Sequence, residues 1–336
     1  MVKGCFVGSG SDGLQQPEVA KTILQLAGKS ATDITVLYLG TATYDLPAPK
    51  MKQTLRFVEA GCTITEIKCV QPLEEVTPPT QMEALCATAD VILVSGGNTL
   101  YAVDTWNKIG LTSLLHTAAQ RGAVLTGGSA GAICWFDAGH SDSGDPDSYK
   151  DVMLQAAVTA ASAATSATSS ANASTSVAQP SEKTTSTLNN GSSVSGDESS
   201  DAPTAGEVAK SWDYVRVPCL GFLPGLVCPH ADKIQSNGVL RATDFDAMLL
   251  RHPQETGICI DHFAALVVEN DRYRVLSLSD QPGSVLPGGR FSADRRGVPG
   301  IWLKRVVTSA ADSKITNVEP NTHSSSAASS SSSSSS

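Results

Sequence analysis

Short apolar runs alternate with helical patterns through the first half of the chain, and Gly28 and Gly61 end two of the expected helices. Strands that are apolar on both faces and are separated by helices indicate a mostly parallel sheet covered on both sides. The predicted fold class is therefore α/β, a doubly wound, mostly parallel sheet with helices on both faces. The predicted strands are 5–7, 34–39, 63–70, 91–94 and 123–126, and the predicted helices are 17–27, 48–60, 81–88 and 99–121.

The second half of the globular sequence is richer in β patterns, and we expect it to extend the same sheet. Its apolar runs lie at 215–226, 257–260, 264–268, 273–278 and 301–307, with the end of a helix at 245–251.

Two segments are dominated by small polar residues and have almost no large apolar side chains. Such segments cannot offset the conformational entropy that ordering costs, so we predict that they are disordered. The predicted organisation is one catalytic α/β domain, 1–150 plus 211–308, interrupted by a low-complexity insertion at 151–210 and followed by a Ser-rich tail at 309–336.

Composition indicates which partners and which cellular location to expect. The formal net charge is -9 and no dense Lys/Arg run exists, so nucleic acid is not an expected partner. No apolar run reaches the length of a membrane span and no signal peptide opens the chain, so we expect a cytoplasmic protein without a membrane partner. The 8 cysteines are scattered without metal-ligand spacing and are expected to be buried, reduced thiols.

The most informative segment is Gly127-Gly128-Ser129-Ala130-Gly131, which follows an apolar strand and precedes an apolar segment, 133–136, expected to be helical. It fits the Gly-x-Ser-x-Gly pattern in the strand-turn-helix context that the pattern requires. A tight turn there would expose the Ser129 hydroxyl as a nucleophile and aim the Ala130 N–H at an oxyanion. A serine that merely caps a helix is the alternative.

A second glycine-rich turn, 95–99, follows the strand at 91–94. Neighbouring parallel strands bring their carboxyl-end loops together. We therefore expect the Gly97 N–H to supply a second oxyanion donor.

A serine hydroxyl needs a base, and the chain has 6 histidines. His230 is our prediction because it follows an apolar strand through the turn Cys228-Pro229. His140 is the rival and His262 is a weaker one. The carboxylate that orients the base is expected among Asp137, Asp142, Asp145 and Asp147, with Asp142 preferred.

The segment 8–13 fits Gly-x-Gly-x-x-Gly after a strand. A dinucleotide site also wants an acid at the end of the second strand, where Leu39-Gly40-Thr41 has none. Nucleotide binding is therefore disfavoured.

The Gly-Gly-Asn turn, the Gly-Gly-Ser-Ala-Gly-Ala elbow and the later Pro-His turn together resemble peptidase family S51, which contains the aspartyl dipeptidases (peptidase E) and the cyanophycinases. The resemblance implies a class I glutamine amidotransferase-like fold and a triad in which Ser129 is the nucleophile and His230 the base. The matching acid lies near Asp142, and a small gap would favour Asp145. Gly97 and Ala130 match the oxyanion positions.

The predicted function is a serine-type peptidase that hydrolyses small peptides, as a dipeptidase or exopeptidase, through an acyl-enzyme and without a metal or organic cofactor. Specificity for an N-terminal aspartate is implied by the resemblance alone, and it would need a cation from the set Arg216, Lys233, Arg241 and Arg251. The alternatives are an esterase of the α/β-hydrolase type and a non-catalytic binding module of the same fold. The substrate side chain and the oligomeric state are left open.

Overall fold

We describe the protein from a computed structural model, which places residues 2–70, 75–149, 209–278, 280–292, 294–308 and 313–318. Apart from its last two residues, the predicted insertion 151–210 lies outside these ranges, as does most of the predicted tail. Residues 313–318 correct the tail prediction, because they form the strand β15 (Ser313–Val318), which pairs with β14 (Ile301–Thr308).

The first sheet has 7 strands in the order β11-β10-β1-β5-β4-β2-β3. Strands β1, β5, β4, β2 and β3 run parallel to their neighbours, and β10 and β11 add an antiparallel edge. The strands are β1 (Lys3–Val7), β2 (Thr35–Leu39), β3 (Thr63–Ile67), β4 (Val91–Val94), β5 (Val124–Gly128), β10 (Ala264–Glu269) and β11 (Arg272–Ser277).

Both faces of this sheet are apolar, as the continuous runs predicted. Phe6 packs with residues of α4, α5 and α6 on one face, whereas Cys5 and Val7 pack with α2 and α3 on the other. The doubly wound prediction is therefore confirmed for the first sheet. The helices are α2 (Pro17–Ala27), α3 (Pro47–Glu59), α4 (Pro79–Thr88), α5 (Thr99–Ile109) and α6 (Leu111–Gln120).

The single helix predicted over 99–121 is wrong, because Gly110 divides it into α5 and α6. Gly110 has φ 77°, a left-handed conformation that glycine adopts at little cost, and its N–H donates to Trp106 O as α5 ends.

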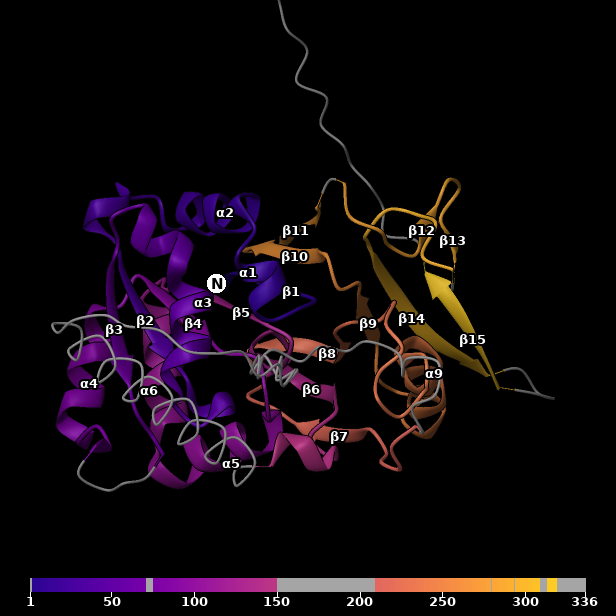
Figure 1. The fold of residues 1–336 in the computed structure, drawn as a ribbon, viewed down its shortest axis with the longest axis horizontal. Coiled ribbons are helices and arrows are strands. Elements are labelled where there is room, and N and C mark those ends of the chain that lie inside the picture. Colours follow the sequence, from indigo (N-terminus) through magenta and orange to yellow (C-terminus); the bar gives the residue numbers. More distant parts are fainter. Residues whose placement is uncertain are drawn as a thin grey trace, which may run out of the picture.

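Most of the second half does not extend the first sheet, which corrects our expectation. It forms a second sheet of 6 strands in the order β15-β14-β9-β8-β6-β7 (Figure 1), and only β10 and β11 join the first. The other strands of this sheet are β6 (Phe136–Ser141), β7 (Val215–Pro218), β8 (Leu223–Cys228) and β9 (Gly257–Ile260).

The two sheets share a core. Val227, Ile258 and Ile301 of the second sheet belong to the same buried cluster as Phe6 and Leu125 of the first. The helix α9 (Arg241–Arg251) packs on the second sheet through Phe245, Met248 and Leu249. The remaining elements are α1 (Ser11–Leu14), α7 (Ala130–Ile133), β12 (Val285–Leu286), β13 (Arg290–Phe291) and the 3-10 turns Ala31–Asp33, Thr41–Thr43 and Pro146–Ser148.

Candidate active site

Ser129 stands at a sharp turn between β5 and α7. Its backbone has φ 53° and ψ -118°, a conformation that costs a non-glycine residue about 1–3 kcal/mol. The helix after it is four residues long, so the expected helix at 133–136 is wrong, and Phe136 already begins β6. A strained serine between a strand and a helix is the geometry of a nucleophile elbow.

The glycines around Ser129 are required by close backbone contacts. A Cβ on Gly128 would lie 2.0 Å from the carbonyl oxygen of Ser9, and one on Gly131 would lie 2.1 Å from that of Val94. Any side chain at either position would therefore push the elbow away from the segment after β1 or from the end of β4.

The turn after β4 lies directly against the elbow, as we predicted. A Cβ built on Gly96 would be 3.6 Å from Ser129 Cβ. Gly97 has φ 110°, and its backbone packs so closely on Ala42 that a Cβ would lie 2.4 Å from Ala42 O. Among the residues that the structure describes, neither the Gly97 N–H nor the Ala130 N–H donates a hydrogen bond, so both donors remain available to a ligand.

His230 and Ser129 are both held at the carboxyl end of β1. The Ser129 N–H donates to Val7 O at 3.1 Å, and the His230 N–H donates to Gly8 O at 3.0 Å. His230 also has a positive φ of 49°, and both side chains belong to residues that are 1% exposed. Two strained polar residues, far apart in the sequence, are thus brought to neighbouring positions on one strand end.

His262 also lies in this site, although the sequence made it a weak candidate. It follows β9, and its Nδ1 lies 2.8 Å from Nδ1 of His230. Its Nε2 lies 3.1 Å from an oxygen of Asp12, and its N–H donates to Asp232 Oδ1 at 2.7 Å. Burial is the main cause that lowers the pKa of His230 to about 3 and that of His262 to about 4.

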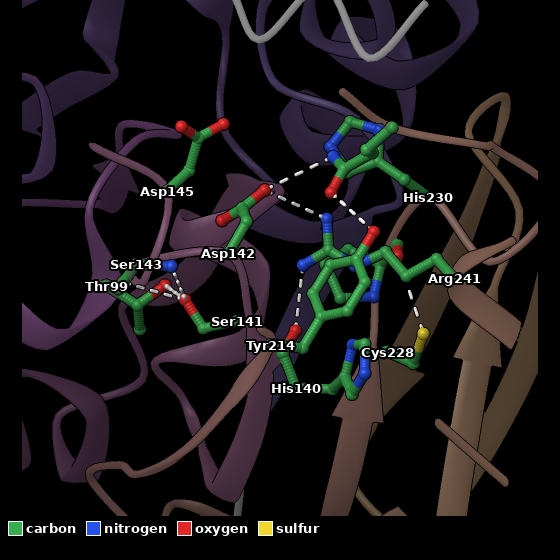
Figure 2. A network of polar contacts seen from close by, with 12 residues as sticks. Thr99, His140, Ser141, Asp142, Ser143, Asp145, Tyr214, Cys228, His230 and Arg241 are labelled. Atoms are coloured by element: carbon green, nitrogen blue, oxygen red, sulfur yellow. Dashed lines mark hydrogen bonds and ion pairs between the residues drawn. The ribbon is translucent and has the colours of Figure 1, made fainter. Parts of the chain in front are cut away.

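Asp142 follows β6 and is 8% exposed. Its Oδ2 accepts from Arg241 Nη1 at 3.0 Å and from Gln235 Nε2 at 3.2 Å, and Figure 2 shows Arg241 lying beside this carboxylate. The negative charge of Asp142 favours the protonated form of His230, against the larger effects of burial and of Arg241. A buried anion is therefore present near the candidate base.

Asp145, the alternative acid, uses its carboxylate to hold the loop that follows β6 and not to contact His230 in any described hydrogen bond. Its Oδ1 accepts from the Asp147 N–H at 3.0 Å, which caps the turn Pro146–Ser148, and its Oδ2 accepts from Ser236 Oγ at 3.1 Å. The rival base His140 lies inside the second sheet. Its Nε2 lies 2.8 Å from Asp244 Oδ1, and its ring stacks on Tyr214 with 4.3 Å between centroids.

The four candidate cations have different surroundings. Arg241 is fully buried against Asp142, and Arg216 pairs with Glu255. Arg251 ends α9, whereas Lys233 donates its N–H to His230 O at 2.9 Å and therefore shares a turn with the candidate base.

Sequence reasoning missed the roles of Asp12, Gln235 and Asp232 in this site. Asp12 belongs to the glycine-rich segment 8–13 and lies in α1, the first element after β1, and this position was the available signal. All 8 cysteines are free and 6 of them are buried, as expected. Within the described ranges, no group of three or more His, Cys, Asp or Glu side chains has a metal-binding arrangement, and no helix is long and apolar enough to cross a bilayer.

Comparison with known proteins places the chain in a family. The model of peptidase family S51 matches residues 6–158, which include the elbow, the Gly97 turn and Asp142 and exclude His230. An uncharacterized peptidase of Bacillus subtilis, YgaJ, is 32% identical over 111 residues, covering 33% of this chain and 46% of that protein. A crystal structure of a peptidase from an acI-B1 Actinobacterium has the same fold, with a TM-score of 0.50 and 16% identity over 82% of this chain and 87% of that one.

A longer match links the chain to a protein of Trypanosoma brucei brucei named G2/mitotic-specific cyclin-1. The two are 30% identical over 300 residues, which cover 84% of this chain and 77% of that protein. That name is the trypanosome protein's own. The match to the S51 model, the likeness to a Bacillus peptidase and the shared fold lead to one conclusion: the chain belongs to peptidase family S51 and is a serine-type peptidase.

Proposed function

We propose that the protein hydrolyses small peptides through an acyl-enzyme, with Ser129 as nucleophile, His230 as base and Asp142 as the supporting acid. One observation carries the proposal: consecutive carbonyls of one strand end, Val7 O and Gly8 O, bind the N–H groups of Ser129 and His230. These two backbone anchors hold the residues at adjacent positions of one strand end, from which an alcohol and an imidazole can meet as nucleophilic catalysis requires.

The proposed reaction begins when Ser129 Oγ attacks the scissile carbonyl carbon and its proton passes to His230. The imidazolium then protonates the leaving amine, and the C–N bond breaks to give an ester on Ser129. A water molecule, deprotonated by His230, attacks this ester, the ester C–O bond breaks to release the acid, and the proton returns from His230 to Ser129 Oγ. No metal or organic cofactor takes part in these steps.

The oxyanion of the tetrahedral intermediate is assigned to the N–H groups of Gly97 and Ala130. Both are unused donors among the described residues, and the turn that carries Gly97 packs against the elbow. Loss of one such donor costs about 2.7–4 kcal/mol in related chemistry.

Asp142 is proposed to favour the imidazolium through its charge. It is buried, so its field is poorly screened, and Arg241 and Gln235 hold it in one position. The ion pair with Arg241 reduces this effect, and we therefore expect Asp142→Asn to slow the reaction less than loss of His230.

The burial of the two reacting residues favours a small substrate. Ser129 and His230 are each 1% exposed, so a folded protein chain cannot approach the hydroxyl. This supports a dipeptidase or exopeptidase. For an N-terminal aspartate, Lys233 is the best-placed of the four candidate cations, because it follows His230 in the same turn. The free thiols support a reducing compartment, and a cytoplasmic location stays our proposal.

Hydrolysis of a dipeptide panel tests the proposal. The wild type should cleave dipeptides, Ser129→Ala should be inactive while folded, and Ser113→Ala, on the exposed side of α6, should match the wild type. Equal cleavage of Asp-Leu and Ala-Leu would reject aspartyl specificity. Full activity of Ser129→Ala, or turnover of p-nitrophenyl esters without any peptide cleavage, would reject the proposed reaction.

A further inference from the structure

In the candidate active site, the buried imidazoles of His230 and His262 contact each other through their Nδ1 atoms. His230 Nδ1 and His262 Nδ1 are 2.8 Å apart, and the two residues are 1% and 2% exposed. A hydrogen bond needs one donor and one acceptor, so one of these nitrogens carries a proton and the other carries a lone pair. Which of them is the donor decides which nitrogen of His230 is basic.

Asp12 settles the direction of the hydrogen bond. An ionised carboxylate only accepts, so His262 Nε2, 3.1 Å from Asp12 Oδ2, must be the donor. The hydrogen bond from His262 is the main cause that lowers the pKa of Asp12, which keeps it ionised. A neutral imidazole has one N–H, and therefore His262 Nδ1 has the lone pair and accepts from His230 Nδ1–H. The lone pair of His230 is thus left on Nε2, the nitrogen that must take the proton from Ser129.

The backbone of His262 is fixed on both sides. Its N–H donates to Asp232 Oδ1 at 2.7 Å, and its carbonyl accepts from Ser9 Oγ at 2.7 Å. Ser9 lies beside Asp12 in the segment after β1, and Asp232 lies two residues after His230. The segment after β1 and the segment after β8 therefore each bind both the backbone and the side chain of His262.

We propose that His262, anchored by Asp12, is a positioning residue that holds the proton on His230 Nδ1 and so leaves Nε2 as the catalytic base. This rests on the proposed function of Ser129 and His230. The proposed role of His262 adds to that of Asp142. The Asp142 carboxylate supplies negative charge, whereas the pair of His262 and Asp12 selects the tautomer and the ring orientation of His230. The charges of Arg241, Lys233 and Asp12 also shift the pKa of His230. The pKa of His262 is shifted by the charges of Lys233 and Asp232 and by its contact with Asp12.

Substitutions of His262 test the proposal through turnover and pH dependence. His262→Leu removes the acceptor and should lower kcat about 100-fold or more, with little change in KM, because the tautomer is no longer fixed. His262→Glu places a carboxylate on Nδ1–H directly. It should retain far more activity than His262→Leu, and its acid limb of kcat/KM should move to higher pH, because a negative neighbour raises the pKa of His230.

Asp12 provides a variant with low risk of unfolding, since its side chain is 54% exposed. In Asp12→Asn the amide can turn and donate to His262 Nε2, which permits the wrong tautomer, and kcat should fall about 10-fold. The matched controls are Glu18→Gln, an acid in the first turn of the neighbouring α2, and His116→Gln, a histidine of α6. Neither should change kcat.

A direct readout is the ¹⁵N spectrum of histidine-labelled protein. The wild type should show His230 protonated on Nδ1, and Asp12→Asn should show a mixture of tautomers. Unchanged kcat, pH profile and spectrum in Asp12→Asn and His262→Glu would overturn the inference, even if His262→Leu does not fold. The proposed function fails separately, if Ser129→Ala keeps its activity.

Discussion

His140 and His230 share burial and a lowered pKa but differ in where the fold places them. His140 and His230 are both almost completely buried, and burial lowers the pKa of both, to about 4 and about 3. His140 lies within the strand β6 and packs against Tyr214 and Phe245. His230 lies beyond the end of β8, with φ 49°, next to the strained Ser129.

This difference shows that burial and a shifted pKa do not identify a base. Structural histidines have both features, and a base also needs a position at a strand end where an activated group is held. Strained backbone marks that position here, because Ser129 and His230 are both among the residues with positive φ.

Replacing each of these two histidines in turn should have the largest and most different effects. His230→Ala should lower kcat about 10⁴-fold or more, because Ser129 loses its proton acceptor. His140→Phe should keep kcat near the wild-type value while costing about 1–3 kcal/mol in the free energy of unfolding, since its hydrogen bond to Asp244 is lost. Kinetics on one dipeptide and urea unfolding of both variants supply the measurements. A reversal of the two effects would assign the base to His140.

The ion pair beside His230 should contribute mainly to stability. Arg241 is fully buried, and Arg241→Met would leave Asp142 as an uncompensated buried charge, costing about 3–5 kcal/mol. The double variant Arg241→Met/Asp142→Leu removes both charges and should recover much of this loss. Denaturant unfolding of the two variants checks this, and equal destabilisation of both would contradict a buried pair.

Gly97 and Gly110 both have a positive φ and allow a matched test of the oxyanion turn. Gly97→Ala has no room for its Cβ, which would lie 2.4 Å from Ala42 O, so the N–H must move and kcat should fall about 10²–10³-fold. Gly110→Ala has φ 77° and no atom within 4 Å of the new Cβ, so it should cost about 1 kcal/mol of stability without loss of kcat. Equal kcat for the two variants would exclude Gly97 from the oxyanion site.

The last expected effect is confined to acid and concerns stability. His140, His230 and His262 have lowered pKa values in the folded state, so below pH about 6.5 the unfolded chain binds protons that the folded chain does not. Stability should therefore fall as the pH drops from about 6.5 towards 4, by at most about 1.4 kcal/mol per pH unit for each histidine. His140→Phe should reduce this slope without moving the pH profile of kcat/KM. An unchanged slope would contradict the burial of that ring.

The features that depend on local patterns could be predicted from the sequence. The elbow at Ser129 and the turn at Gly97 follow apolar strands directly, and β4 and β9 have the predicted bounds. The role of His262 depends on pairing between strands that are distant in the sequence. Parallel register sets Cys228 opposite Cys259, which brings the two following histidines together. No periodicity in the sequence specifies that register.

The ion pair between Asp142 and Arg241 could not be predicted from the sequence for a similar reason. Arg241 begins α9, and its guanidinium reaches Asp142 only because α9 packs on the second sheet, whose existence the apolar runs did not reveal. A run that is apolar on both faces fits either sheet equally well, so the division into two sheets also escaped prediction.

Covalent labelling with a fluorophosphonate, followed by peptide mapping, tests most directly whether Ser129 is a nucleophile activated by His230. We expect one adduct, on Ser129, formed rapidly in the wild type, at least about 10³-fold more slowly in His230→Ala, and not at all in Ser129→Ala. An adduct on another serine, or a wild-type protein that does not react while folded, would contradict this assignment.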